Sequence, residues 1–314
     1  MLSAFTKAAK LYKEEKYNQA LGEISKLDKK YKSEENILIF TGNCYDSLGK
    51  KEIAKSFYRK AYKKNKQSQA ALLNLAIIYF EQKKYMLSKF YIKKLLHINS
   101  KNYNSITLLG NIYKEKKQYE KAIKLYQKAI GIEKNFYTAN INLADIYYQQ
   151  KKYSQAYAHA KKALISEPQK AEGIKLFAEI SIENFQPDDA ILYLEKLAKK
   201  TNADYWIYNL LSQLYMQQKK YETSIKAAQK AVEISQGENS QHINFGYILY
   251  DSILADQNEL VQKYADIWLK KYPKNSIVQH MANSVLHNQK VSQNDITYVR
   301  EIFNAFANDF EDIL

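Results

Sequence analysis

The sequence predicts an all-α protein made of about eight stacked helical hairpins, and three observations support this prediction. A small residue recurs every 34 positions from Ala20 to Ser224. Aromatic and small residues recur at fixed distances before and after it. Only 8 Gly and 3 Pro occur in 314 residues, which leaves little of the turn chemistry that sheets need. Because one amphipathic hairpin cannot bury its own apolar face, regularly spaced hairpins are expected to stack.

Residues 102–135 show the pattern of one unit most clearly. Apolar residues recur there at intervals of three and four, as expected for two amphipathic helices, and a tight turn is expected at 115–118. The first helix is predicted to present Ile106, Leu109, Ile112 and Tyr113 on one face, and the second Tyr119, Ala122, Ile123, Tyr126, Ala129 and Ile130.

The same spacing gives the order of elements along the whole chain. The small residue near the start of each second helix is Ala20, Ala54, Ser88, Ala122, Ala156, Ala190 or Ser224. Twelve positions earlier lies another small residue, as close helix crossing requires: Ala8, Gly42, Ala76, Gly110, Ala144, Ala178 or Ser212. An eighth unit, with Val261 at the equivalent position, follows about three extra residues near 237–241. The predicted units are 1–34, 35–68, 69–102, 103–136, 137–170, 171–204, 205–238 and 242–275.

This pattern of small, aromatic and tyrosine positions resembles the tetratricopeptide repeat (TPR) family over nearly the whole chain. The resemblance implies a right-handed superhelix, or α-solenoid, extending over residues 1–275. After Lys274 the spacing is lost, and residues 276–314 are expected to form C-terminal capping helices, because the end units of a solenoid have one face in solvent. Ser292 and Asp295 resemble a capping box that opens the last of them.

Composition and motifs disfavour several classes of function. The formal net charge is +15, yet 276–314 hold two basic and five acidic residues. Lysines spread over solvent faces are typical of soluble helical arrays, so nucleic-acid binding is disfavoured. No phosphate loop, nucleophile elbow or pair of histidines at metal-binding spacing is present, so we expect no enzyme, cofactor or metal. The single Cys44, the charged first residues and the lack of a long apolar run predict a cytoplasmic protein that does not cross a membrane.

The candidate site follows from the family resemblance. In TPR superhelices the first helix of each pair lines the concave wall, which implies that its residues not used in packing contact a partner. A side-chain amide donates and accepts, and can therefore bracket the backbone of an extended peptide. The alternative that some of these residues pack against the next unit stays open. The candidate partner-binding residues are Asn43, Asn74, Ile77, Phe80, Asn111, Lys114, Asn142, Asp145, Tyr148, Trp206, Asn209 and Gln213.

The leading hypothesis is a non-enzymatic scaffold that binds an extended peptide or protein segment in the concave groove. A first alternative rests on the final residues, which resemble the segment joining a TPR array to a class I S-adenosylmethionine-dependent methyltransferase domain. That resemblance implies a substrate-recognition part whose catalytic domain is not in this sequence. A second alternative is nucleic-acid binding through the basic surface. The partner and the oligomeric state are not predicted. The methyltransferase resemblance is carried by Tyr298, Val299, Phe303, Phe306, Ala307, Phe310 and Leu314.

Overall fold

The computed structural model describes residues 2–27, 29–200, 203–235, 238–275, 278, 279 and 282. The described residues form seventeen α-helices and no strand. This confirms the predicted all-α solenoid of helix-turn-helix units. The chain divides into two compact units, Met1–Ile146 and Tyr147–Leu314, and each is considered by itself.

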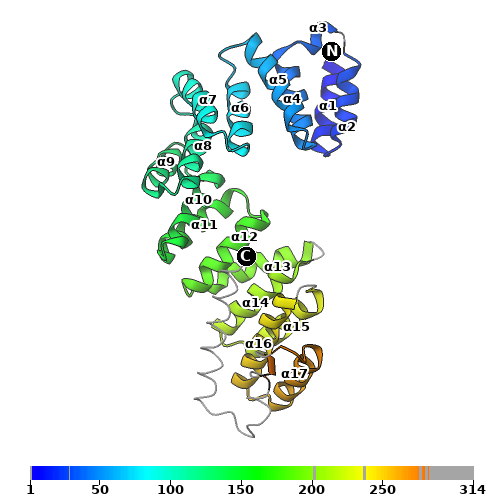
Figure 1. Ribbon diagram of the computed structural model, residues 1–314, viewed down its shortest axis with the longest axis vertical. Helices are drawn as coiled ribbons and strands as arrows, with labels where there is room; N and C mark the ends of the chain where they lie inside the picture. The colour runs from blue at the N-terminus through cyan, green and yellow to red at the C-terminus, as the bar shows by residue number, and fades with distance from the viewer. Residues whose placement is uncertain are drawn as a thin grey trace. The chain divides into compact units, whose positions relative to one another are not determined.

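In the first unit, consecutive helices pack as hairpins (Figure 1). Helices α4 and α5, α6 and α7, and α8 and α9 form such pairs, and the first helices α6 and α8 also contact each other directly. The unit contains α1 (Leu2–Lys13), α2 (Tyr17–Ser25), α3 (Lys29–Lys32), α4 (Glu35–Ser47), α5 (Lys51–Lys64), α6 (Gln69–Glu81), α7 (Tyr85–Ile98), α8 (Tyr103–Glu115) and α9 (Tyr119–Ile132). Helix α10 (Tyr137–Gln149) spans the division between the units.

The second unit repeats this arrangement. Helices α14 and α15 and helices α16 and α17 form hairpins, and the first helices α12, α14 and α16 contact one another in sequence. The unit continues with α11 (Tyr153–Ser166), α12 (Ala171–Glu183), α13 (Pro187–Lys200), α14 (Tyr205–Gln217), α15 (Tyr221–Ile234), α16 (Glu238–Leu254) and α17 (Asn258–Lys271).

The turn inside each hairpin has the same backbone geometry. One residue takes a positive φ, such as 55° at Lys117, and the next amide closes the first helix, as when Gln118 N–H donates to the Tyr113 carbonyl at 2.9 Å. This is the bond of a Schellman helix end, for which glycine is the usual residue. Within the described residues only one of these positions is glycine: Glu15, Gly49, Lys83, Lys117, Lys151, Phe185, Lys219 and Asp256.

The small residues predicted to allow close helix crossing are buried. Ala76, Ala144 and Ala178 are at most 1% exposed. At Gly110 an added Cβ would lie 2.6 Å from Cε1 of Tyr126, and at Gly42 an even closer contact with Tyr58 would result. Glycine is therefore required where a tyrosine of the second helix packs flat against the first helix.

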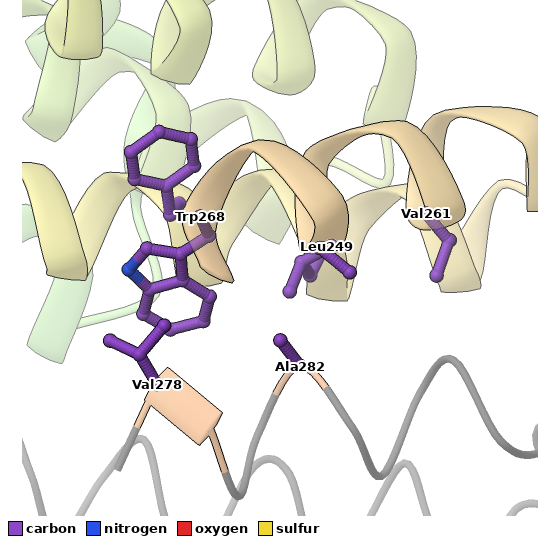
Figure 2. Close-up of a cluster of buried hydrophobic side chains, with 7 residues drawn as sticks. Leu249, Val261, Trp268, Val278 and Ala282 are labelled. Carbon is purple, nitrogen blue, oxygen red and sulfur yellow. The ribbon is translucent and has the colours of Figure 1, made fainter. Parts of the chain in front are cut away.

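The last described core cluster joins α16 and α17 to residues that follow them. Trp268 is 2% exposed and packs with Phe245 and Val278; Figure 2 shows Val278 beside the indole and Ala282 below Leu249. The predicted division into an array of residues 1–275 and caps of residues 276–314 stays a prediction. The expected capping box at Ser292 and Asp295, and the residues resembling a methyltransferase linker, lie outside the described residues.

Candidate functional site

Two of the predicted asparagines form a pair between neighbouring first helices. Asn74 on α6 donates its Nδ2 hydrogen to Oδ1 of Asn43 on α4, at 3.0 Å. The same Oδ1 accepts a second hydrogen bond, of 2.8 Å, from the hydroxyl of Tyr58 on α5. Both asparagines are half-buried, and Tyr58 is 1% exposed. A buried tyrosine therefore fixes the orientation of a partly exposed amide pair.

The same arrangement recurs two hairpins later in the chain. Asn142 on α10 donates to Oδ1 of Asn111 on α8 at 3.2 Å, and Tyr126 on α9 donates to that oxygen at 2.8 Å. Tyr126 is fully buried. Asn142 also donates to the Thr138 carbonyl at 2.9 Å. The four asparagines Asn43, Asn74, Asn111 and Asn142 form what we call the asparagine face.

The two halves of the asparagine face differ in charge. Lys114 forms an ion pair with Asp145, and its Nζ also donates to Oδ1 of Asn142 at 3.1 Å. Both charged side chains are about a quarter exposed, at 22% and 26%. In the first half Asp46 and Ile77 stand at the positions equivalent to Lys114 and Asp145, so no such ion pair forms there. The first half therefore has amides without the Lys–Asp pair, and its one acidic group at these positions, Asp46, lies 3.8 Å from Nζ of Lys51.

The remaining hydrogen-bonding atoms decide what the face can bind. Oδ1 of Asn43 and Oδ1 of Asn111 each accept two internal bonds, while neither Nδ2 has a partner among the described residues. Oδ1 of Asn74 is likewise without a donor in that part of the chain, whereas Oδ1 of Asn142 is taken by Lys114. The first pair thus offers one donor group and one acceptor, the combination that a peptide group requires.

Ile77 and Phe80 have a packing role. Both lie against a buried cluster that includes Ile92, Leu108 and Ile112, and the Phe80 ring lies 5.8 Å from that of Tyr85. These contacts match the alternative that the two residues pack against a neighbouring unit. They remain partly exposed, so a role in partner contact stays a prediction.

The predicted residues of the second unit form separate contacts. Asn209 donates to Oδ1 of Asn244 at 3.2 Å and accepts from Nε2 of Gln213 at 2.9 Å. The Lys175 ammonium lies 5.9 Å from the centre of the Trp206 ring. Tyr148 packs against another ring of its own hairpin, that of Tyr153, at 5.9 Å. A third amide pair between first helices therefore exists in the second unit.

Three participants were not among the predicted residues: Tyr58, Tyr126 and Asn244. The two tyrosines could have been found from a Gly-Asn dipeptide that occurs at 42–43 and 110–111, each followed by a tyrosine fifteen residues after the asparagine. Asn244 lies after the extra residues near 237–241, where the 34-residue spacing gives no position for it.

Burial also settles the ionisation of the site's hydroxyl groups. Burial raises the pKa of Tyr58 and of Tyr126 well above the ordinary value, so both stay protonated hydrogen-bond donors. Burial raises the pKa of the Cys44 thiol to about 11, which fits a packed, unreactive side chain. Among the described residues no group of His, Cys, Asp and Glu could hold a metal ion, and none of the helices there is long and apolar enough to span a membrane.

Comparison with known proteins identifies the repeats. One tetratricopeptide repeat model matches residues 113–180, and a second such model matches residues 37–67 and 207–237. No curated protein matches the chain. Among solved structures, the chain is similar to the C-terminal part of a TPR repeat-containing protein from Cytophaga hutchinsonii, with 17% identity, a TM-score of 0.57 and coverage of 79% of this chain and 98% of that one. It is also similar to YrrB, described as a TPR protein with an unusual peptide-binding site, with 16% identity, a TM-score of 0.50 and coverage of 59% of this chain and 96% of that one. At such identities the similarity shows the fold alone.

Proposed function

Starting from a chain that contains tetratricopeptide repeats, we propose that the protein is a non-enzymatic scaffold that binds an extended segment of another protein along its asparagine face. The observation that carries the proposal is the pairing of Asn43 with Asn74. This pair leaves an amide donor on Asn43 and an amide oxygen on Asn74 for a ligand. TPR proteins generally mediate protein–protein interactions, and the related YrrB structure is described as having a peptide-binding site.

The chemistry favours recognition of a peptide backbone over recognition of a particular side chain. An extended peptide exposes a carbonyl and an N–H at each residue, and a preoriented amide pair can satisfy both without selecting a sequence. Tyr58 and Tyr126 hold the accepting oxygens in place from inside the fold, so little rotamer entropy is lost on binding. Beside the second pair, Lys114 and Asp145 would add preferences for charged side chains.

The asparagines to replace for a test are Asn74 and Asn142, because their removal leaves the interior satisfied. In the double variant Asn74→Ala/Asn142→Ala, Asn43 and Asn111 keep their bonds from the buried tyrosines, and Lys114 keeps Asp145. A change at Asn111 would instead leave the fully buried Tyr126 hydroxyl without its acceptor, so lost binding there would be confounded with lost stability.

The partner is captured from a lysate of the native cells with the immobilised chain, its contacting segment is synthesised, and its Kd is measured by calorimetry. Loss of two hydrogen-bonding sites should weaken binding about tenfold or more. The matched control is Gln127→Ala/Gln155→Ala, which removes two exposed amides from second helices. Equal affinity for the native chain and the Asn74→Ala/Asn142→Ala variant would refute the assignment of the face.

Two finer expectations belong to the same proposal. We place the protein in the cytoplasm, in keeping with a single cysteine that is a buried, free thiol. We also expect no specific binding of nucleic acid, so any affinity for RNA or DNA should fall steeply between low and physiological salt.

A further inference from the structure

A second surface lies on α7, which is the second helix of its hairpin, and it leaves several large apolar side chains exposed to solvent. Helix α7 leaves four large side chains exposed: Met86 at 78%, Phe90 at 49%, Leu87 at 44% and Ile98 at 38%. Met86, Phe90 and His97 recur at helical spacing along one side, with Lys93 and Lys94 between the last two. We call these residues, with Tyr62 and Lys66 of the neighbouring hairpin, the α7 face.

The repeats themselves provide the comparison that makes Met86 unusual. Met86 lies two positions before the small residue Ser88, in the first turn of the second helix. Five of the seven equivalent positions are acidic, which suits the positive end of the helix dipole. α7 has no acidic residue in its first turn. Met86 therefore departs from the repeat pattern, and the packing of the repeat does not explain it. The equivalent residues are Asn18, Glu52, Glu120, Ser154, Asp188, Glu222 and Glu259.

Cations and aromatic rings are interleaved on the α7 face. Nζ of Lys94 donates to the Tyr62 hydroxyl at 2.9 Å and lies 4.9 Å from the centre of the Phe90 ring. Nζ of Lys66 lies 4.4 Å from the Tyr62 ring centre. These side chains, with Lys93, His97 and Ile98, line an open groove of about 650 Å³. The groove thus has apolar walls and positive charges already held in position.

The charge around the groove is almost entirely of one sign. Helices α5 and α7 carry six and three Lys or Arg residues respectively, and their one acidic residue is Glu52, which is bound to Lys55. A ligand that fits must therefore bring carboxylates as well as apolar side chains. Met86, Leu87 and Ile98 are aliphatic and offer neither a stacking ring nor a charge, so they favour a protein ligand over a nucleic acid.

We propose that the α7 face docks a segment of another protein in which large apolar side chains alternate with Asp and Glu. The apolar side chains cover Met86, Leu87 and Phe90, and the carboxylates pair with Lys93 and Lys94. Contacts of this kind combine a desolvated apolar centre with a charged rim. The α7 face is separate from the asparagine face, which lies on first helices, so either surface can fail a test without affecting the other.

The test uses the full chain and a fluorescent pool of peptides of about twelve residues, with every position drawn from Asp, Glu, Phe and Leu. Two matched pools replace the acids by Asn and Gln, or the apolar residues by Ser and Gly. Fluorescence anisotropy should show that the acidic apolar pool binds at least about tenfold more tightly than either matched pool. Met86→Gln/Phe90→Ser should weaken that binding about tenfold, and Lys93→Glu/Lys94→Glu at least as much.

The control for net charge is Lys124→Glu/Lys128→Glu, which makes the same charge change at exposed positions of α9 and should leave binding nearly unchanged. All the replaced residues are exposed, and circular dichroism confirms that each variant is folded. The proposal is overturned if the α9 variant loses as much affinity as the α7 variant, or if Met86→Gln/Phe90→Ser binds as the native chain does. It is also overturned if the pool shows no binding at about 100 µM protein, or if poly(U) RNA binds through Lys93 and Lys94 more tightly than the pool.

Discussion

Replacing Asp251 by asparagine should stabilise the protein above neutral pH. Asp251 lies on α16 and is 1% exposed. Its Oδ2 accepts a hydrogen bond from the Ser224 hydroxyl of α15, while its Oδ1 has no partner among the described residues. A carboxylate so placed has lost its hydration and gained one hydrogen bond, so its charged form is destabilised.

The magnitude follows from the shift in pKa. Burial raises the pKa of Asp251 from 3.8 to about 7, although the Ser224 hydrogen bond acts in the opposite direction. Between these values the folded chain keeps the proton and the unfolded chain has released it. The free energy of unfolding therefore falls as pH rises, by about 1.4 kcal/mol per pH unit and by at most about 4 kcal/mol over the whole interval. Below the lower value the penalty is absent. An asparagine side chain at this position would carry no charge at any of these pH values, so the variant should escape the loss.

The assay is urea unfolding at about pH 5 and about pH 8, followed by tryptophan fluorescence, to which Trp206 and the buried Trp268 of α17 both contribute. The native chain should lose stability between the two conditions, and Asp251→Asn should lose markedly less. Asp266→Asn, an equal change of charge on an exposed side chain of α17, serves as the control. Parallel pH dependence of the native chain and Asp251→Asn, or a less stable variant at the higher pH, would refute the reasoning.

Three further predictions concern the repeated hairpin, and urea unfolding measures each of them. Gly110→Ala should lower the free energy of unfolding by about 1 to 2 kcal/mol, because the clash of the new methyl group with Tyr126 exceeds the gain in helix propensity. Gly131→Ala, which meets nothing within 4 Å, should raise it instead. Tyr126→Phe should lower the free energy of unfolding by about 1 kcal/mol, since the donor to Asn111 is lost. An unchanged free energy of unfolding would show that this hydrogen bond does not contribute to stability. Lys117→Gly should raise the free energy of unfolding by about 1 kcal/mol, because glycine adopts the left-handed backbone conformation without strain. A lower free energy of unfolding would contradict the idea that Lys117 is strained.

The fold could be predicted because its signal is redundant. The spacing of small residues, of tyrosines and of turns each gives the same period, and the second helices begin at Tyr17, Lys51, Tyr85 and Tyr119, as that period requires. The turn conformation could not be predicted, since lysine rarely signals a positive φ. At Lys117 the hydrogen bonds that close the helix outweigh a local preference that would have favoured glycine.

The candidate site was predicted only in part. The positions that the family resemblance implies for the concave wall include Asn43 and Asn74, and both lie partly exposed on first helices. Which atoms those amides use internally depends on the reach of the Tyr58 hydroxyl from a different helix, and no local pattern encodes that distance. For the same reason phase could not distinguish the packing of Phe80 from a free aromatic anchor. Whether these residues bind a partner stays a prediction.

The recurrence of the Gly-Asn pair on α4 and α8, but not on α6, has a consequence for anyone who wishes to redesign the chain. The interchangeable module is two hairpins long, because neighbouring hairpins play unlike roles in holding the amides. Joining Gly42 directly to Asn111 would excise one whole module and keep the helical phase on both sides of the junction. Excising a single hairpin would instead make neighbours of two first helices with the same role in the amide pairs. The fold could persist, but the pairing of the asparagines, and with it the ligand chemistry, would be lost.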